Sequence, residues 1–323
     1  MAEHHARALR GSRADPPGRA RSEPARRQIY SAALQQFEEL LAASCAVGPA
    51  SRPLPLFYAL SQAGRAIVAA YGREPHITAH GLAEDRRVES DDLLHRRVSR
   101  VPRKDGTDAF GAVARVTSSG DLKDGAELGA LWAALPHAYR VPPESWRSDW
   151  RLALDVETGP LASSGNEGLS VLLISMGGNP HVEGLEVFTG GRYPTLPDGT
   201  TGGLRGGREI AAGSWLADVA IPDVKDDHDA VLDRVAPQFY GGSQRALIPT
   251  LPDEPELLTP LMLWWALLFG LSVTARYHPA PWARALAIEG SKQAVPLEAL
   301  LERAVERLPA IVYDAIFLNA DFE

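Results

Sequence analysis

The sequence predicts an α+β protein in which helices from both ends of the chain form one bundle, with an antiparallel strand-rich lobe inserted between them. Three observations predict this arrangement. Apolar residues recur at helical spacing near both ends, alternating and β-branched residues gather in the middle, and a 19-residue stretch near residue 260 carries no charge. Helices and strands that occur in separate runs favour an α+β fold over alternating βαβ units.

Composition narrows the class of protein. The 323 residues are 45% hydrophobic and 23% charged, which is typical of a globular protein and excludes a largely disordered chain, a collagen-like fibre and a disulfide scaffold. The net charge of −8 argues against a domain that coats nucleic acid nonspecifically. A single cysteine, Cys45, cannot form an internal disulfide, so we expect a reducing, cytoplasmic location.

Four segments are expected along the chain: a disordered basic arm (1–27), an N-terminal helical part (28–105), a strand-rich insert (106–222) and a C-terminal helical part (223–323). The arm holds seven arginines, three acidic residues and three prolines, with almost no large apolar side chain. Such a composition predicts a mobile segment. Two interpretations of it stay open: contact with RNA, DNA or an acidic partner, or an extension without function.

The N-terminal helical part begins with two amphipathic patterns. Apolar residues at three- and four-residue spacing predict helices over 28–41 and 53–71, with Pro53 in the first turn of the second helix and Gly72 ending it. The charged stretch 83–104 carries both signs, which indicates an exposed helix or loop.

The middle of the chain predicts strands. Alternation and β-branched residues indicate them at 110–117, 150–157, 169–175, 185–189 and 210–221, and a short helix is expected over 125–135. The glycine-rich run 190–207 is typical of a long hairpin connection.

The C-terminal part contains the uncharged stretch 257–275. Its length approaches that of a membrane span, but Pro260 and several hydroxyl residues interrupt it and Arg276 follows directly. We therefore expect a buried core helix and no membrane contact. Further helices are predicted over 282–288 and 297–317.

Candidate site residues are few. Arg73 and His80, with six residues between them, fit the arginine-x-histidine spacing of the HEPN ribonucleases, in which arginine would stabilise a phosphorane and histidine would move a proton. In the structural interpretation, His80 and Gly81 cap a following helix. His76 and His80 do not form a convincing metal pair, since Pro75 and Gly81 interrupt a helix there. We expect no metal and no cofactor.

A second candidate pair follows the uncharged stretch. Arg276 and His278 form part of a polar and aromatic cluster that could line a pocket. The structural alternative is that both side chains are favoured by the dipole at a helix C-terminus. Since both the uncharged helix and the 53–71 helix are strongly apolar, we expect His80, Arg276 and His278 to lie close together at the junction of bundle and sheet.

Four stretches of the sequence resemble the YaaC-like family of bacterial proteins: LFYALSQAGRA at 56–66, His80-Gly81-Leu82, LGALWAALP at 128–136 and LSVTARYHPAPW at 271–282. The resemblance covers about residues 28–317 and implies an architecture but no reaction. The helical part is also similar to the HEPN fold.

Three functions are compatible with these observations. The leading prediction is a non-catalytic binding or regulatory module, because no complete catalytic set is present. The alternative is a HEPN-like, metal-independent ribonuclease that uses Arg73, His80, Arg276 or His278. A third is a small-molecule pocket in the strand-rich lobe. Expected partners are RNA or a protein, and a homodimer is compatible with the sequence.

Overall fold

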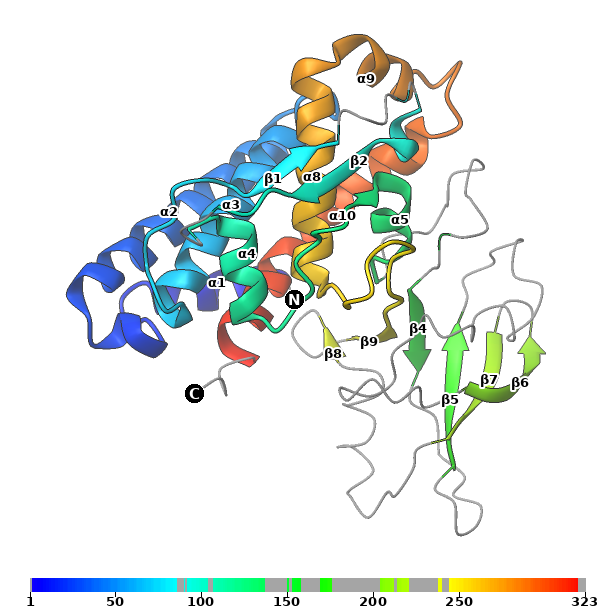
Figure 1. Cartoon of the computed structure of the whole chain (residues 1–323), viewed down its shortest axis with the longest axis horizontal. Coiled ribbons are helices and arrows are strands. Elements are labelled where there is room, and N and C mark those ends of the chain that lie inside the picture. Colours follow the sequence, from blue (N-terminus) through cyan, green and yellow to red (C-terminus); the bar gives the residue numbers. More distant parts are fainter. Residues whose placement is uncertain are drawn as a thin grey trace.

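The computed structural model describes residues 2–85, 90, 92–103, 107–136, 150, 153–157, 169–175, 204–211, 214–220, 238–239 and 244–318. Helices near both ends pack together, and strands occupy the middle of the chain (Figure 1), so the α+β prediction is confirmed. The helices and short helical turns are α1 (Ala2–Ser12), η1 (Gly18–Arg21), α2 (Pro24–Ala46), α3 (Pro53–Tyr71), η2 (Leu93–His95), α4 (Ala109–Val116), α5 (Leu128–Ala133), α8 (Pro260–Tyr277), α9 (Pro279–Ala285), α10 (Ala294–Tyr313) and η3 (Asp314–Leu318).

Helix α8 forms the centre of the core. Every residue from Pro260 to Thr274 is buried, as expected for a helix that is apolar on all sides. It packs against α3, where a Cβ atom on Gly64 would lie 2.2 Å from the ring of Trp265. Glycine at this position therefore sets the close approach of the two helices. The buried core helix is confirmed, and none of the described helices is both long and apolar enough to span a membrane.

The two ends of the chain meet in one bundle. Helix α10 contacts α1, α2, α3 and α8. The Tyr71 hydroxyl at the end of α3 donates a hydrogen bond to the Ile316 carbonyl oxygen at 2.5 Å, and the ring of His5 lies 5.0 Å from that of Tyr313. The predicted bundle of N- and C-terminal helices is present.

The prediction of a disordered arm over 1–27 is wrong. This segment contains α1 and η1, and Leu9 and Ala20 are fully buried. Arg26 is only 4% exposed and donates hydrogen bonds to the carbonyl oxygens of Gly72 and Arg73 at 2.9 and 2.8 Å, which satisfies the C-terminal end of α3. The prediction from composition treated the arginines only as charges, whereas an arginine that caps a helix stabilises the folded segment.

A small antiparallel sheet lies across α8 (Figure 1). Its strand order is β1 (Leu82–Glu84), β2 (Arg97–Arg100) and β3 (Ala126–Glu127). The described part of the charged stretch 83–104 is therefore not an exposed helix or loop: it supplies most of β1, all of β2 and η2. Its arginines pair with acidic side chains, Arg96 with Glu84 and Arg97 with the distant Asp253. The helix expected over 125–135 is divided between β3 and α5.

The strand expected over 110–117 is instead helix α4. Asp108 caps this helix by accepting a hydrogen bond from the Gly111 amide at 2.7 Å, while Phe110, Val113 and Ala114 bury one helical face. Because α4 packs on α3 and α5 packs on α8, the first part of the expected 106–222 insert lies with the helices.

The inserted lobe is an antiparallel six-stranded sheet with the order β6-β7-β5-β4-β9-β8. Its strands are β4 (Leu154–Glu157), β5 (Leu169–Ser175), β6 (Leu204–Ala211), β7 (Ser214–Ala220), β8 (Gln238–Phe239) and β9 (Gln244–Leu247). The prediction for 169–175 is confirmed, those for 150–157 and 210–221 are confirmed in part, and residues 204–207 belong to β6 and not to a connection. The expected strand 185–189 and residues 190–203 lie outside the described residues.

Candidate functional site

The segment that carries His80 is fixed by its backbone. The amides of Ala109 and Phe110 donate hydrogen bonds to the carbonyl oxygens of Ala79 and His80, at 2.8 and 3.2 Å. Gly81 has a φ of +81°, and a Cβ there would lie 2.5 Å from the carboxylate of Asp108. Only glycine fits this position. His80 and Gly81 therefore lead into strand β1, and the expectation that they cap a following helix is wrong.

The ring of His80 lies against two phenylalanines. Its centroid is 6.2 Å from that of Phe57 on α3 and 5.2 Å from that of Phe269 on α8. Partial desolvation of the ring by these neighbours, together with the positive charge of Arg276, lowers the pKa of His80 below its ordinary value. Nδ1 accepts a hydrogen bond from the Leu82 amide at 3.1 Å. The neutral ring therefore carries its proton on Nε2, which makes it a hydrogen-bond donor and leaves no free lone pair for a base.

Arg276 lies in the last turn of α8 between two tyrosines. Its guanidinium carbon is 5.9 Å from the ring of Tyr58 and 5.0 Å from that of Tyr277, and Nη1 donates to the Tyr58 hydroxyl at 3.3 Å. Arg276 is exposed, and the tyrosines are 41% and 67% exposed. We name Tyr58, His80, Arg276 and Tyr277 the α8-end surface.

His278, at the C-terminus of α8, contacts strand β1. Its Nε2 lies 3.1 Å from the Glu84 carboxylate, whose other oxygen accepts a hydrogen bond from Arg96 Nε at 2.7 Å. Since β1 also follows His80 directly, this strand links the two histidines. The structure thus brings His80, Arg276 and His278 to one junction of α3, α8 and β1.

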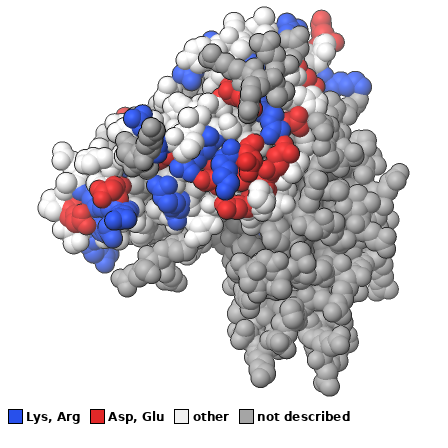
Figure 2. Space-filling model, in the orientation of Figure 1, with Lys and Arg blue, Asp and Glu red and all other residues white. Residues whose placement is uncertain are grey.

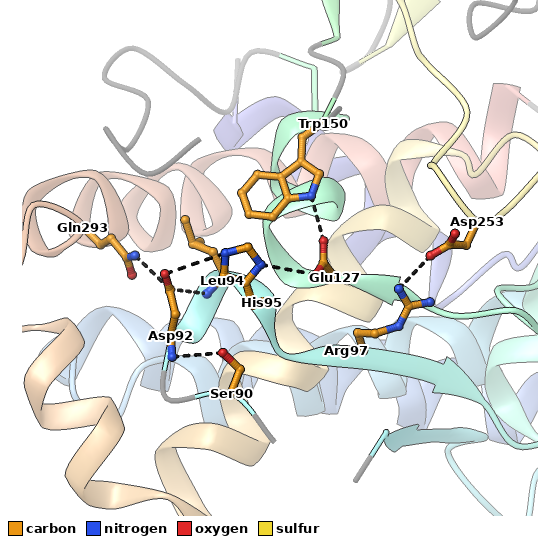
Figure 3. Close-up of polar contacts among 9 residues, drawn as sticks. All are labelled: Ser90, Asp92, Leu94, His95, Arg97, Glu127, Trp150, Asp253 and Gln293. Atoms are coloured by element: carbon orange, nitrogen blue, oxygen red, sulfur yellow. Dashed lines mark hydrogen bonds and ion pairs between the residues drawn. The ribbon is translucent and has the colours of Figure 1, made fainter. Parts of the chain in front are cut away.

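The same polar network continues across η2 (Figure 3). Arg96 donates to the Ser90 carbonyl oxygen at 3.2 Å, and the Ser90 hydroxyl accepts from the Asp92 amide at 3.2 Å. The Asp92 carboxylate then accepts hydrogen bonds from the Leu94 amide and from the side chain of Gln293, both at 3.0 Å. These contacts connect α8, both strands and the start of α10 into one support.

His95 marks the far end of this network. Its Nδ1 lies 3.3 Å from the Glu127 carboxylate, and the other oxygen of Glu127 accepts from the Trp150 indole N–H at 2.9 Å. The ring of His95 packs 5.4 Å from that of Trp150, and Asp92 lies 4.0 Å from Nε2. Both nitrogens of His95 thus face carboxylates, so the ring holds η2 against β3.

Arg73 lies elsewhere. It lines a hollow of about 610 Å³ beside His76 and Arg115, just past the C-terminal end of α3. His80 packs on Phe57 near the N-terminal end of the same helix, and the helix rises about 21 Å from Phe57 to Tyr71, at 1.5 Å for each of 14 steps. The structure does not bring the Arg73 and His80 side chains together.

A buried ion pair between Arg100 and Asp108 packs against Gly81, next to His80. Arg100 Nε and Nη2 donate to the two oxygens of Asp108 at 3.0 and 2.9 Å, and Nη1 pairs with Asp121. A Cβ on Gly111 would meet the Arg100 guanidinium at 2.2 Å. In Figure 2, basic and acidic side chains lie side by side across the middle of the face shown.

Little in the sequence indicates the supporting residues. Glu84 and His278 are 194 positions apart, and Gln293 is 201 positions from Asp92, so no local spacing connects them. Among the described residues, no group of three or more histidine, cysteine, aspartate and glutamate side chains is arranged to hold a metal ion. What the site offers is a neutral donor, a cation and two exposed aromatic rings on a rigid base.

Comparisons with known proteins found one family. A family model described as YaaC-like Protein matches residues 6–148 and 218–316, which is most of the chain. The match begins inside the segment 1–27, where the structure has helix α1. No curated protein and no solved structure matches the chain.

Proposed function

The chain belongs to the YaaC-like family, and because that description names no reaction, we propose from its site that the protein is a non-catalytic binding module. Its partner is another protein, which docks on the α8-end surface. The observation that carries this proposal is the exposed stack of Tyr58, Arg276 and Tyr277 beside the neutral ring of His80.

Side-chain chemistry favours a protein partner. Tyrosine and arginine are the residue types that contribute most to binding energy at protein interfaces, since they offer a large, rigid contact area together with a polar group. His80 Nε2–H and the Arg276 guanidinium both donate hydrogen bonds, so the partner presents carbonyl or carboxylate oxygens there. The net charge of −8 disfavours an extended nucleic acid.

Rigidity supports binding as well. The surface is carried by α3 and α8, which form the core, and by the segment before β1, which backbone hydrogen bonds hold to the start of α4. The network from His278 to Trp150 fixes β1 against α8. A preorganised surface loses little conformational entropy when it binds. His80 lacks the environment of a general base, because its Nδ1 accepts the hydrogen bond from the Leu82 amide and its Nε2 carries the proton. The contact of His278 Nε2 with the Glu84 carboxylate ties that ring to β1.

Photo-crosslinking tests the proposal. A benzophenone amino acid in place of Tyr277 should give a discrete crosslinked protein in the cells from which the chain comes, and the same group at Leu318, which is 53% exposed on η3, should not. Adding Arg276→Ala to the Tyr277 probe should weaken the crosslink about tenfold, as removal of an interface anchor does. Equal crosslinking from both positions, or no effect of Arg276→Ala, contradicts the proposal.

A metal-independent ribonuclease is the second candidate. The observation that favours it is that Arg276 stacks on Tyr58 while the neighbouring Phe57 contacts the His80 ring, so a cation and a histidine share one surface, as stabilisation of a phosphorane would need. Incubation of mixed RNA with the purified protein in EDTA distinguishes the two functions. RNA that stays intact supports the binding module, whereas cleavage that is lost in both His80→Ala and His278→Ala supports the nuclease.

A further inference from the structure

A hollow lined by arginines lies on the N-terminal segment, away from the α8-end surface. Its volume is about 530 Å³, and it is formed by the chain around η1 and the first three turns of α2. Three arginines line it: Arg13, Arg21 and Arg27. Between them lie side chains that can donate hydrogen bonds, among them Ser31 and Gln28. The hollow exists because this segment is folded.

The charge of the lining is one-sided, since no carboxylate belongs to it. Arg21 pairs with Asp15 at 3.5 Å, and both side chains are more than 65% exposed, so this pair is weak. Arg13 lies 3.6 Å from Glu38, which Arg10 already holds at 2.9 Å.

Arg27 donates to the Arg21 carbonyl oxygen at 2.5 Å, and no carboxylate in the described part of the chain pairs with it. Its neighbour Arg26 is buried and caps α3. The structure therefore uses some arginines of this segment for folding and leaves three of them around one hollow with little compensating charge.

We propose that this hollow binds the phosphate groups of a small molecule that carries at least two of them. Guanidinium groups bind phosphate oxygens through paired hydrogen bonds, and hydroxyl and amide donors complete such a shell. The three positive charges around the hollow exceed the single negative charge of a carboxylate ligand. The first turn of α2 lines the same hollow through Pro24 and adds the positive end of the helix dipole.

A small molecule fits better than a nucleic acid strand. The volume falls within the roughly 300–1,000 Å³ of small-molecule sites. No aromatic ring is among the lining residues, so nothing there offers a stacking surface for bases. The site is also independent of the proposed partner surface, because Arg26 connects this region to the C-terminal end of α3 while His80 lies near the N-terminal end.

Calorimetric titration of the full chain with sodium tripolyphosphate tests the proposal. Wild type should bind, and Arg13→Gln combined with Arg27→Gln should weaken the affinity about tenfold or more, equivalent to about 1.4 kcal/mol. Ser31→Glu, which places a carboxylate in the hollow and removes no contact of the arginines, should abolish binding. The matched control is Arg303→Gln, since Arg303 pairs only with the neighbouring Glu306 among the described contacts and should leave the affinity unchanged.

Three results would overturn the assignment. The first is the absence of binding to wild type at about 1 mM tripolyphosphate, where a ligand of useful affinity saturates a site. The second is unchanged affinity in both the double variant and Ser31→Glu, with thermal unfolding showing that both are folded. The third is tighter binding of a single-stranded oligonucleotide than of tripolyphosphate, which would assign the hollow to a nucleic acid backbone.

Discussion

Replacing Asp108 by alanine should lower the free energy of unfolding by disrupting the ion pair next to the His80 segment. The Asp108 carboxylate is fully buried, receives two hydrogen bonds from Arg100 and caps α4 through the Gly111 amide. Its loss leaves the Arg100 guanidinium, which is only 10% exposed, with the Asp121 carboxylate as its ion-pair partner. The substitution therefore removes a helix cap and half of a buried ion-pair network.

The magnitude follows from these contacts. Removing one partner of a buried pair costs about 3–5 kcal/mol, and loss of an N-cap costs about 1 kcal/mol. Because Asp121 still compensates part of the charge of Arg100, we expect the free energy of unfolding to fall by about 3–4 kcal/mol, at the lower end of that range. This is a large part of the roughly 5–15 kcal/mol that stabilises a typical domain.

Urea unfolding followed by circular dichroism measures this loss. The matched control is Asp253→Ala, because Asp253 is 54% exposed and its pair with Arg97 should contribute less than about 1 kcal/mol. A loss below about 1 kcal/mol for Asp108→Ala would refute the reasoning, since the buried pair would then behave like an exposed one.

The same carboxylate predicts a pH dependence. Burial alone would raise the pKa of Asp108, but the hydrogen bonds from Arg100 and the Gly111 amide outweigh it and hold the pKa below its ordinary value of 3.8. The stability that Asp108 supplies is therefore complete above pH 3.8 and lost as pH falls through the lowered pKa of the folded state. The difference in unfolding free energy between wild type and Asp108→Ala should close over that range.

Three further substitutions have defined outcomes in thermal or urea unfolding. Burial and then nearby carboxylates raise the pKa of Glu254, so its ionised form destabilises the folded state and Glu254→Gln should raise the unfolding midpoint at pH 7. The gain should shrink as pH falls below the raised pKa and be gone below the ordinary value of 4.5, and a lower midpoint at pH 7 contradicts this. Gly64→Ala places a methyl group against the Trp265 ring and should cost about 2 kcal/mol, whereas a neutral effect would show that α3 and α8 can move apart. Arg26→Met should cost about 3 kcal/mol because it uncaps the buried carbonyl groups that end α3, while Arg27→Met should cost less than about 0.5 kcal/mol.

Helices with continuous apolar patterns could be predicted closely. The 53–71 helix has the predicted bounds, and α8 begins three residues after the start of the uncharged stretch. The first shows an apolar face at helical spacing over about five turns, and the second is an uncharged, apolar run of similar length, which a strand rarely reaches. The prediction of a strand over 110–117 was wrong because eight small and β-branched side chains fit both the helical and the strand spacing. The N-cap residue Asp108, which favours a helix, lies before this segment.

The candidate site could be predicted only in part. His80 and Arg276 were expected together because they flank the two most apolar helices, and the structure places them at one junction. Arg73 was assigned by its spacing in sequence, yet the length of α3 separates it from His80. The supporting pair of Glu84 and Arg96 gave no signal, since both belong to a stretch of mixed charge in which paired and solvated residues look alike.

The protonation state of His80 tests the account most directly. Nitrogen-15 NMR of histidine-labelled protein at pH 7 should show a neutral His80 ring with Nδ1 unprotonated and Nε2 protonated, and titration should give a pKa below the ordinary 6.5. A ring protonated on Nδ1, with a free Nε2 directed at solvent, or an imidazolium at pH 7, would contradict it. Either result would give His80 the form that acid–base catalysis uses and would remove the physical ground for a non-catalytic binding module.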